Sequence, residues 1–441
     1  MPEMKRADLS AARPAEAAPA AQHVIVIGAG VVGVSTALAL AEAGHRVEVY
    51  EAASEAAQGA SFANAGLISP GHCFSWAEPG ALGVFVKSLF GKADGLGVTR
   101  PMSPSLWRWG WQFWRHSSAA QWERDSRAAL ALSAYSRDVH FAAARGNGVA
   151  PALYGGAARG ILYLYQQGQS PRAIEKDMLA SAGEPVRQVD AAGLAQIEPL
   201  LQQAGQRFEQ GVYCPNDGTG NAREYTAAAL QRAQALGVHF HFNAPVQRLL
   251  VKGDRIAGVE LQHSVGVVKA DTVVMAAGLA SASLLKPLGY DLPIYPVTGY
   301  SITFHHEEDF EPAVGAVSLA DKIAWAGFGR GVVRFTGFAD IGPRGSEALG
   351  EKRFAALESF ARRIYPQLTH CRPQRWIGQR PMTPDGIPVL GASRHANLVL
   401  NCGHGAMGWT MAGGCAQIVC DLVAGRAPAI DCAPYRWNRF S

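Results

Sequence analysis

The segment from His23 to Glu51, HVIVIGAGVVGVSTALALAEAGHRVEVYE, restricts the fold of this chain more than any other part of its sequence. A short apolar run ends in Gly28-x-Gly30-x-x-Gly33, a helix-period segment follows, and a second apolar run ends in Glu51. In a strand–helix–strand unit these glycines allow a tight turn, a backbone approach to a pyrophosphate, and close helix–sheet packing. An acid about 20 residues further on accepts hydrogen bonds from ribose hydroxyls and repels a 2′-phosphate. The segment therefore predicts a Rossmann-like unit for an ADP-containing dinucleotide, and the alternative is a unit that binds nothing.

Length and composition indicate a large globular enzyme rather than a fibrous or disordered chain. The 441 residues are 48% hydrophobic and 17% charged, which fits two or three domains. The net charge is +4 without a block of Lys or Arg, so no nucleic acid is expected as a partner. The seven cysteines have neither a CxxC pair nor zinc-like spacing, which predicts reduced thiols, a cytoplasmic location and no metal site.

The chain carries no segment that reads as a signal peptide or a membrane span. Residues 1–21 are rich in Ala and Pro and predict a disordered tail. The uncharged run from Ile25 to Ala41 is apolar, but its glycines and its strand-then-helix pattern assign it to the nucleotide-binding unit. We therefore expect no transmembrane helix.

Strand and helix patterns of the β/α type return in the middle of the chain and near its end. The predicted elements are a helix over 222–236, a hairpin over 246–251 and 255–261, a buried parallel strand over 268–278, a strand over 398–401 and a helix over 410–425. Residues 294–304 and 332–341 alternate like strands of a separate antiparallel sheet. This interleaving favours a flavoprotein over a nicotinamide dehydrogenase, whose cofactor domain is contiguous.

Two further segments have the residue types that bind charged ligands. The loop NCGHGAMGWT (401–410) has three glycines before a helix, so its backbone N–H groups can stabilise negative charge on a ligand, although a tight turn is the structural alternative. In WIGQRPMTPDGIPVLG (376–391), Arg380 can bind a carboxylate with both arms of its guanidinium. A surface ion pair is the alternative for Arg380.

Taken together, these motifs resemble the FAD-dependent D-amino acid dehydrogenases of small-subunit type, within the D-amino acid oxidase superfamily. The resemblance runs from Val24 to the C-terminal region, and its most specific segments are VIGAGVVGV, SFANAGLISPG, YCPNDGTG, VQRLL, YPVTGYS, RPMTPDGIPVLG and LNCGHGAMGWT. It implies an α/β fold in which a discontinuous Rossmann-like FAD-binding domain carries a second, α+β substrate domain built on a mixed, largely antiparallel sheet. The expected FAD-binding segments are 22–95, 211–290 and 375–441, and the expected substrate-domain segments are 96–210 and 291–374.

The resemblance also implies which residues hold the cofactor. The glycine motif and Glu51 would bind the ADP half of FAD, and the loop from Gly403 to Thr410 would line the isoalloxazine ring. The full expected cofactor set is Val24, Ile25, Val26, Ile27, Gly28, Ala29, Gly30, Val31, Val32, Gly33, Glu51, Ser61, Asn64, Ala65, Gly66, Val246, Ala277, Gly278, Gly403, His404, Gly405, Ala406, Met407, Gly408, Trp409 and Thr410.

The activity that the resemblance implies is oxidative deamination of a small or apolar D-amino acid to a 2-oxo acid and ammonia. Hydride would pass from Cα to flavin N5, Arg380 would clamp the substrate carboxylate, and the electrons would leave to a quinone or another acceptor. One alternative is an oxidase of glycine, sarcosine or proline-like amines that uses O₂. Another is a flavin electron-transfer subunit without catalytic activity of its own.

The chain departs from the family pattern where a substrate side chain would lie. His72, Thr298 and Gln379 stand where family members carry Tyr, Lys and Leu. The covalently flavinylated branch of the superfamily has a cysteine near the arginine, but none lies between Trp376 and Pro388, so we expect non-covalent FAD.

Three side-chain groups have open roles. His72 could contact substrate or relay a proton, or be a hydrogen-bonded loop residue, and Tyr300 could close the pocket or bind the substrate carboxylate, or simply pack. In the segment 107–114, Trp107, Trp111 and Trp114 share one helical face, which we expect to pack into the substrate domain. The alternative for that face is peripheral contact with the inner face of the cell membrane, which would suit quinone reduction.

Overall fold

A six-stranded sheet forms the centre of the first half of the molecule. The computed structural model describes residues 20–440 apart from 90–94, 147, 167, 207, 263–265 and 308–309, so the expected tail over 1–21 lies almost wholly outside the described residues. The strand order is β19-β20-β13-β1-β2-β9, in which every neighbouring pair is parallel except β19 and β20. These strands are β1 (His23–Ile27), β2 (Arg46–Tyr50), β9 (His239–His241), β13 (Thr272–Met275), β19 (Val389–Ala392) and β20 (Leu398–Cys402).

The apolar run in β1 has no polar interruption because both faces of the strand are covered. Val24 and Val26 enter the core on the helical side of the sheet, whereas Ile25 and Ile27 enter the core beneath a small second sheet. That small sheet consists of β10 (Val246–Lys252), β11 (Arg255–Leu261) and β12 (Val267–Val268).

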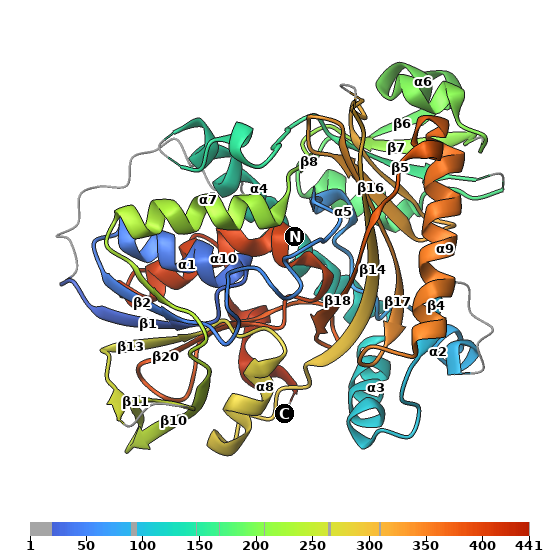
Figure 1. Cartoon of the computed structure of the whole chain (residues 1–441). Coiled ribbons are helices and arrows are strands. Elements are labelled where there is room, and N and C mark those ends of the chain that lie inside the picture. The colour runs from blue at the N-terminus through green and yellow to red at the C-terminus, as the bar shows by residue number, and fades with distance from the viewer. Residues whose placement is uncertain are drawn as a thin grey trace.

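Helices from distant parts of the sequence cover the other face of the six-stranded sheet. α1 packs between α7 and α10, and α10 packs in turn against α4. Figure 1 shows α1, α7 and α10 in blue, green and red, side by side above the strands. The helices are α1 (Val31–Glu42), α4 (Ala119–Arg145), α7 (Ala222–Ala235) and α10 (Gly408–Val423), with α8 (Ala280–Leu285) on the hairpin side.

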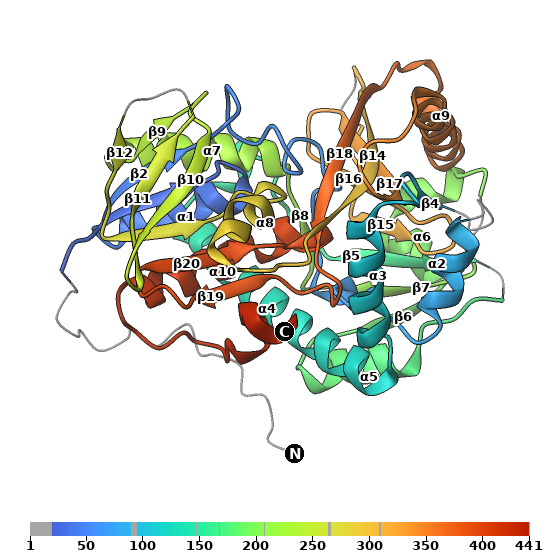
Figure 2. The same cartoon turned by 90° about the horizontal axis from the view of Figure 1, so that it is seen from below.

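A nine-stranded mixed sheet forms the second half and lies beside the first (Figure 2). Its order is β18-β14-β17-β16-β15-β5-β7-β6, and β4 pairs with β17. All pairs are antiparallel except β5 with β15 and β4 with β17. The strands are β4 (Leu96–Val98), β5 (Ile161–Tyr165), β6 (Arg187–Asp190), β7 (Gln210–Cys214), β14 (Tyr295–His305), β15 (Gly315–Ser318), β16 (Ile323–Gly327), β17 (Val332–Ile341) and β18 (Gln374–Met382), while β3 (Leu67–Ile68) pairs with β8 (Gly218–Thr219).

Helix α9 (Glu347–Ile364) covers one side of this sheet through a continuous apolar core. Leu106 and Trp109 of α3 pack with Tyr295 and Val297 of β14 in a separate cluster. The remaining helices are α2 (Ala81–Leu89), α3 (Pro104–His116), α5 (Ala173–Ser181) and α6 (Ala191–Ile197).

The two-part α/β architecture matches the expectation, but several details of it were wrong. The strand predicted over 268–278 is shorter and covers only β13, because Val267–Val268 pairs with the hairpin strand β11 instead. The boundaries at 211 and 375 cut through β7 and β18, both of which belong to the nine-stranded sheet. Helix α4, assigned to the substrate domain, packs on α10 of the first half.

The expectation that the tryptophan face of 107–114 packs into the core was also wrong. Trp109 is buried, but Trp107, Trp111 and Trp114 are 52%, 56% and 47% exposed. Helical periodicity identifies which side chains share a face, but it does not identify which face meets the core.

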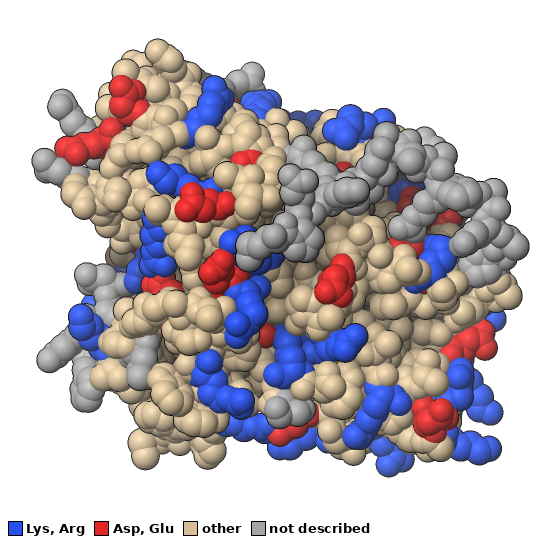
Figure 3. All heavy atoms as spheres, turned by 180° about the vertical axis from the view of Figure 1, so that it is seen from behind, with Lys and Arg blue, Asp and Glu red and all other residues tan. Residues whose placement is uncertain are grey.

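Charged side chains of both signs are interspersed over the back of the molecule (Figure 3). None of the helices in the described part of the chain combines the length and the apolar composition that a bilayer span requires.

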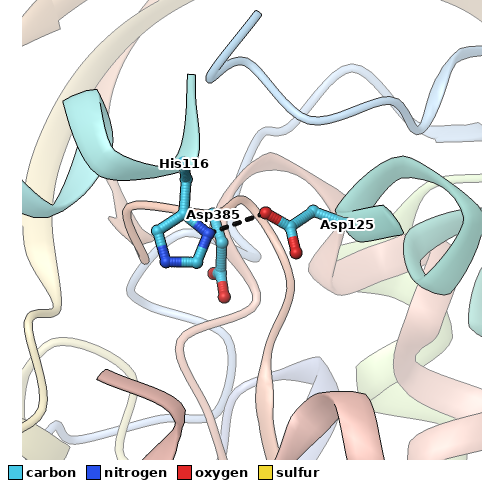
Figure 4. Close-up of side chains that lie close together, drawn as sticks. All are labelled: His116, Asp125 and Asp385. Carbon is cyan, nitrogen blue, oxygen red and sulfur yellow. Dashed lines mark hydrogen bonds and ion pairs between the residues drawn. The ribbon is translucent and has the colours of Figure 1, made fainter. Parts of the chain in front are cut away.

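A buried polar cluster fastens the C-terminal segment to the body of the protein. His116 Nδ1 lies 2.7 Å from Asp125 Oδ2, and Asp385 lies beside them (Figure 4). The ligand atoms of these three residues lie within 4.8 Å of one another. Both carboxylate oxygens of Asp385 accept hydrogen bonds from Arg439, at 2.5 and 3.2 Å. Because this guanidinium already neutralises Asp385, we interpret the cluster as a structural tie.

The tie gives an expected stability change for Arg439→Ala. The substitution leaves Asp385, which is fully buried, without its counter-charge, and should lower the free energy of unfolding by about 3–5 kcal/mol. Arg248→Ala is the matched control, because Arg248 pairs with Glu260 on the surface and should change stability little. Denaturant unfolding measures the free energy of unfolding of both variants. Equal losses in Arg439→Ala and Arg248→Ala would contradict the assignment of the cluster as a structural tie.

Candidate active site

The turn between β1 and α1 is shaped by steric limits at two glycines. Gly28 has φ +105°, and a Cβ there would lie 2.6 Å from the Ala276 carbonyl oxygen. A Cβ on Gly33 would lie 2.0 Å from the carbonyl oxygen of Gly28. Both positions therefore require glycine, as predicted. Helix α1 begins at Val31 without a side-chain cap from its N-cap residue Gly30, and the Val31 N–H donates to Ser61 Oγ at 3.0 Å.

The carboxylate of Glu51 holds the glycine turn from the neighbouring strand. It accepts hydrogen bonds from the Ala29 N–H at 2.6 Å and from the Ala53 N–H at 2.8 Å. Glu51 also lines a cavity that begins at this turn. Its remaining lone pairs can accept ribose hydroxyls, which is the role expected for it.

One continuous cavity of about 1640 Å³ runs from the glycine turn to the nine-stranded sheet. This volume exceeds the usual size of a site for a drug-sized ligand, so it can hold a dinucleotide and a substrate together. The structure brings most of the predicted site residues to its wall. These are Ile27, Gly28, Gly30, Val31, Val32, Glu51, Ser61, Asn64, Ala65, Gly66, His72, Val246, Ala277, Gly278, Arg380, His404, Gly405, Ala406, Met407, Gly408, Trp409 and Thr410.

The other predicted residues do not reach the cavity. Val24, Ile25 and Val26 are fully buried in β1 and shape the site only through the strand, so assigning them direct cofactor contacts was wrong. Ala29, Gly33 and Gly403 are also absent from the wall, although Ala29 contributes the N–H that binds Glu51.

The loop before α10 closes the cavity opposite the glycine turn. His404 and Trp409 line it, and each has a buried ring nitrogen, Nε2 and Nε1, with no partner in the described residues. Burial lowers the pKa of His404 to about 4, so the ring is neutral at physiological pH. Thr410 joins this loop to the segment before the short 3-10 helix Pro70–His72, since its Oγ1 lies 3.2 Å from both the Leu67 carbonyl oxygen and the Ser69 nitrogen.

Arg380 extends from β18 across Gly299 of β14 at the substrate end of the cavity. A Cβ on Gly299 would lie 2.5 Å from Arg380 Nη2, so the glycine makes room for the guanidinium. Arg380 Nη1 donates to the Phe338 carbonyl oxygen at 3.0 Å. Burial lowers the pKa of Arg380 to about 10, which still leaves it charged at neutral pH. No acidic side chain in the described part of the chain forms an ion pair with it.

A β-bulge aims the Phe338 carbonyl at Arg380. The register between β14 and β17 shifts between Thr298 and Tyr300, so that Phe338 and Ala339 together lie opposite Gly299. Phe338 has φ +64°, a left-handed conformation that is uncommon for a bulky residue. Such bulges and strained residues occur often beside active sites.

Tyr300 points away from the cavity, so the expectation that it closes the pocket or binds the carboxylate was wrong. It is 1% exposed, packs edge-on against Phe354 of α9, and donates to Asp340 Oδ2 at 2.8 Å. Asp340 also accepts from Arg353 Nη2 at 2.5 Å. Burial and the Asp340 hydrogen bond raise the pKa of Tyr300.

His72 lines the cavity and is held by a neighbouring aromatic residue. Its ring lies 5.3 Å from that of Tyr163, whose hydroxyl donates to buried Asp217 at 2.7 Å. Asp217 also accepts from the N–H of Gly71. Although His72 is exposed, the protein around its ring and the positive charge of Arg172 lower its pKa to about 4, so it enters the site as a neutral ring.

Several cavity residues carried no signal in the sequence. Trp376 of β18 lies over Gly378, where a Cβ would meet its ring at 1.8 Å. Arg172, at the start of α5, and Phe338 line the cavity from segments far from any motif. Only the backbone register, which single-sequence patterns do not give, could have identified Phe338.

The glycine turn, the acid beside it and the N-terminus of α1 form a dinucleotide-binding site, and the glycine-rich loop before α10 extends it to a site that fits FAD. The chain belongs to the DAO family of FAD dependent oxidoreductases, whose family model matches residues 23–422. FAD is the cofactor of this family.

Solved structures with the same fold cover nearly the whole chain. Glycine oxidase from Geobacillus kaustophilus aligns with a TM-score of 0.69 and 22% identity, over 95% of this chain and 98% of that one. L-proline dehydrogenase from P. horikoshii aligns with a TM-score of 0.68 and 18% identity, over 96% and 99%. L-amino acid deaminase from Proteus vulgaris aligns with a TM-score of 0.68 and 18% identity, over 96% and 94%.

Glu51→Ala should weaken FAD binding by about 10- to 150-fold. The variant removes an ionised acceptor that holds the glycine turn, and hydrogen bonds to charged groups contribute about 1.5–3 kcal/mol. Titration of the apoprotein with FAD measures the dissociation constant. Glu55→Ala is the control on the same loop, because Glu55 is exposed and outside the cavity wall. Equal affinities for the two variants would contradict the role of Glu51.

Tyr300→Phe should affect stability more than turnover. Losing the hydroxyl removes one donor to buried Asp340, which should cost about 1.5–3 kcal/mol of unfolding free energy. The substrate concentration dependence of flavin reduction should change by less than about threefold, because the ring does not reach the cavity. A large increase in KM without loss of stability would show that Tyr300 does contact the substrate.

Proposed function

We propose that the protein oxidatively deaminates small or apolar D-amino acids to 2-oxo acids and ammonia. The observation that carries this proposal is the guanidinium of Arg380, a partly buried positive charge that lines the cavity without an acidic partner among the described residues. A buried charge is costly unless it is paired, so this site favours a ligand with a carboxylate.

The walls near Arg380 favour an uncharged substrate side chain. Phe85, Trp109, Val297 and Ala339 line this part of the cavity and belong to one apolar cluster, and Phe338 of the neighbouring cluster also lines it. An aliphatic or small side chain fits such a wall better than a charged one. The D configuration rests on the resemblance of the sequence motifs to D-amino acid dehydrogenases.

FAD, held non-covalently, would lie along the cavity between the glycine turn and the α10 loop. Glu51 would bind its ribose, the first turn of α1 and Ser61 its pyrophosphate, and the loop from His404 to Thr410 its ring system. When bound, FAD supplies a two-electron acceptor for the hydride that leaves the substrate Cα.

The residues of the chain mainly orient the substrate. Arg380 would hold the substrate carboxylate with both arms of its guanidinium, and the Phe338 carbonyl holds Arg380 in place. The Cα–H bond would therefore keep a single orientation in the site. The amine must be neutral for its lone pair to assist. Water can take that proton, and neutral His72 can accept a hydrogen bond from the amine. The resulting imine then adds water and releases ammonia.

The proposed electron acceptor is a quinone or another oxidant, with the protein in the cytoplasm or at the inner face of the cell membrane. Two alternatives lead to different observations. An oxidase of glycine, sarcosine or proline-like amines would form stoichiometric hydrogen peroxide under air. A non-catalytic electron-transfer subunit would keep its flavin oxidised with every amino acid offered under anaerobic conditions.

The test is anaerobic bleaching of the flavin by a panel of D- and L-amino acids, in wild type and Arg380→Ala. Loss of the clamp should lower kcat/KM by about 30- to 5000-fold, equivalent to about 2–5 kcal/mol, mostly through a higher KM. Arg375→Ala is a matched control on the same strand, because Arg375 pairs with Glu351 and Glu358 on the surface.

Both variants should retain stoichiometric FAD, since neither residue is assigned to the cofactor. Undiminished reduction in Arg380→Ala, or bleaching by L- but not D-amino acids, would overturn the proposal.

A further inference from the structure

Helices α2 and α3 carry an exposed apolar surface whose location links it to the cavity. We define the tryptophan surface as Trp107, Trp111 and Trp114 of α3, Met102 just before it, and Val84 and Val86 of α2; all six are exposed. The two helices touch through Phe85 and Trp107, whose rings lie 6.4 Å apart. Figures 1 and 2 show them side by side at one edge of the molecule.

The exposed tryptophans are not required by the core of the protein. The opposite side of α3 supplies that packing through Leu106 and Trp109, both buried. Trp111 and Trp114 contact each other instead, with ring centroids 5.0 Å apart. Large aromatic side chains gathered on one exposed face indicate a surface that contacts something else.

The charges around this surface select the kind of partner. Lys87, Arg100, Arg108 and Arg115 make the sequence from 79 to 122 basic overall, since its one acid, Asp94, is accompanied by a fifth basic residue, Lys92. Arg108 pairs with Asp291, whereas Lys87, Arg100 and Arg115 have no acidic partner in the described part of the chain. Arg115 follows Trp111 by one helical turn, so a positive charge borders the aromatic side chains.

A second copy of the chain fits this pattern poorly. A two-fold contact would bring each surface against itself and set Lys87, Arg100 and Arg115 against their own copies. Tryptophan with flanking Arg and Lys is instead the composition of a face that lies in the headgroup region of a membrane, where indole rings are amphipathic and basic groups meet anionic lipid.

We propose that the tryptophan surface docks the protein on a bilayer containing anionic lipid. The inner sides of the same helices line the cavity through Phe85, Trp109 and Phe113. Docking would thus bring the cavity wall against the lipid, the phase from which a lipid-soluble electron acceptor arrives. That last consequence rests on the proposed function, but the docking itself does not.

The test measures binding of the FAD-loaded protein to vesicles of phosphatidylglycerol and phosphatidylcholine by flotation, with phosphatidylcholine vesicles in parallel. Wild type should bind the anionic vesicles at least tenfold more tightly, and added salt should weaken the binding. The affinity for anionic vesicles should fall at least tenfold in the triple variant Trp107→Ser, Trp111→Ser, Trp114→Ser. Its control replaces exposed apolar residues elsewhere, Leu153→Ser, Leu236→Ser and Val251→Ser, and should bind like wild type.

A charge variant keeps the test decisive if the triple variant fails to fold. The double variant Lys87→Glu, Arg115→Glu should also bind anionic vesicles at least tenfold more weakly. The control Lys252→Glu, Lys269→Glu, which changes positions at the end of β10 and just after β12, should bind like wild type. Flavin content should stay at the wild-type level in all variants. Substrate turnover, measured with a soluble electron acceptor, should stay at the wild-type level too. Failure of wild type to prefer anionic vesicles, equal losses in the controls, or a change confined to the monomer–dimer equilibrium would overturn the docking proposal and leave the proposed activity untouched.

Discussion

The cost of burying the guanidinium of Arg380 organises the substrate half of the site. Its pKa falls because the surrounding protein displaces part of its water, yet it remains protonated, and the only hydrogen bond found for it within the described residues is to the neutral carbonyl of Phe338. Such a charge gains most from a ligand that arrives with a carboxylate. The β-bulge, the left-handed Phe338 and the absence of a side chain at Gly299 are the local features that let β18 carry this charge into the cavity.

The nearby acid is kept away from this charge. Asp340 lies close enough to favour the charged form of Arg380, but its oxygens already accept hydrogen bonds from Tyr300 and Arg353. These partners lie on the α9 side of the sheet and Arg380 on the cavity side. The sheet thereby separates a satisfied ion pair, which stabilises the fold, from an unsatisfied cation, which can bind a ligand.

The features that the sequence predicted are those set by local chemistry. The glycine turn, the acid after β2 and the loop before α10 could be identified because each depends on residue types within a short segment. The Tyr300 orientation was missed because alternation along β14 places Tyr300 on the face opposite Val297 and Gly299, but it does not say which of the two faces meets the cavity. The boundaries at 211 and 375 were missed because sheet membership depends on partners far away in the chain.

The order of the strands in the six-stranded sheet has a consequence during synthesis. β1 can pair with β2 soon after both leave the ribosome, but its other edge waits for β13, which begins at Thr272, and β13 waits for β20, which begins at Leu398. Through that interval an apolar strand edge has no native neighbour, and such edges are templates for aggregation. We therefore expect recombinant yield to depend on the rate of translation and on chaperones, and scarcely on the chemistry of the finished site.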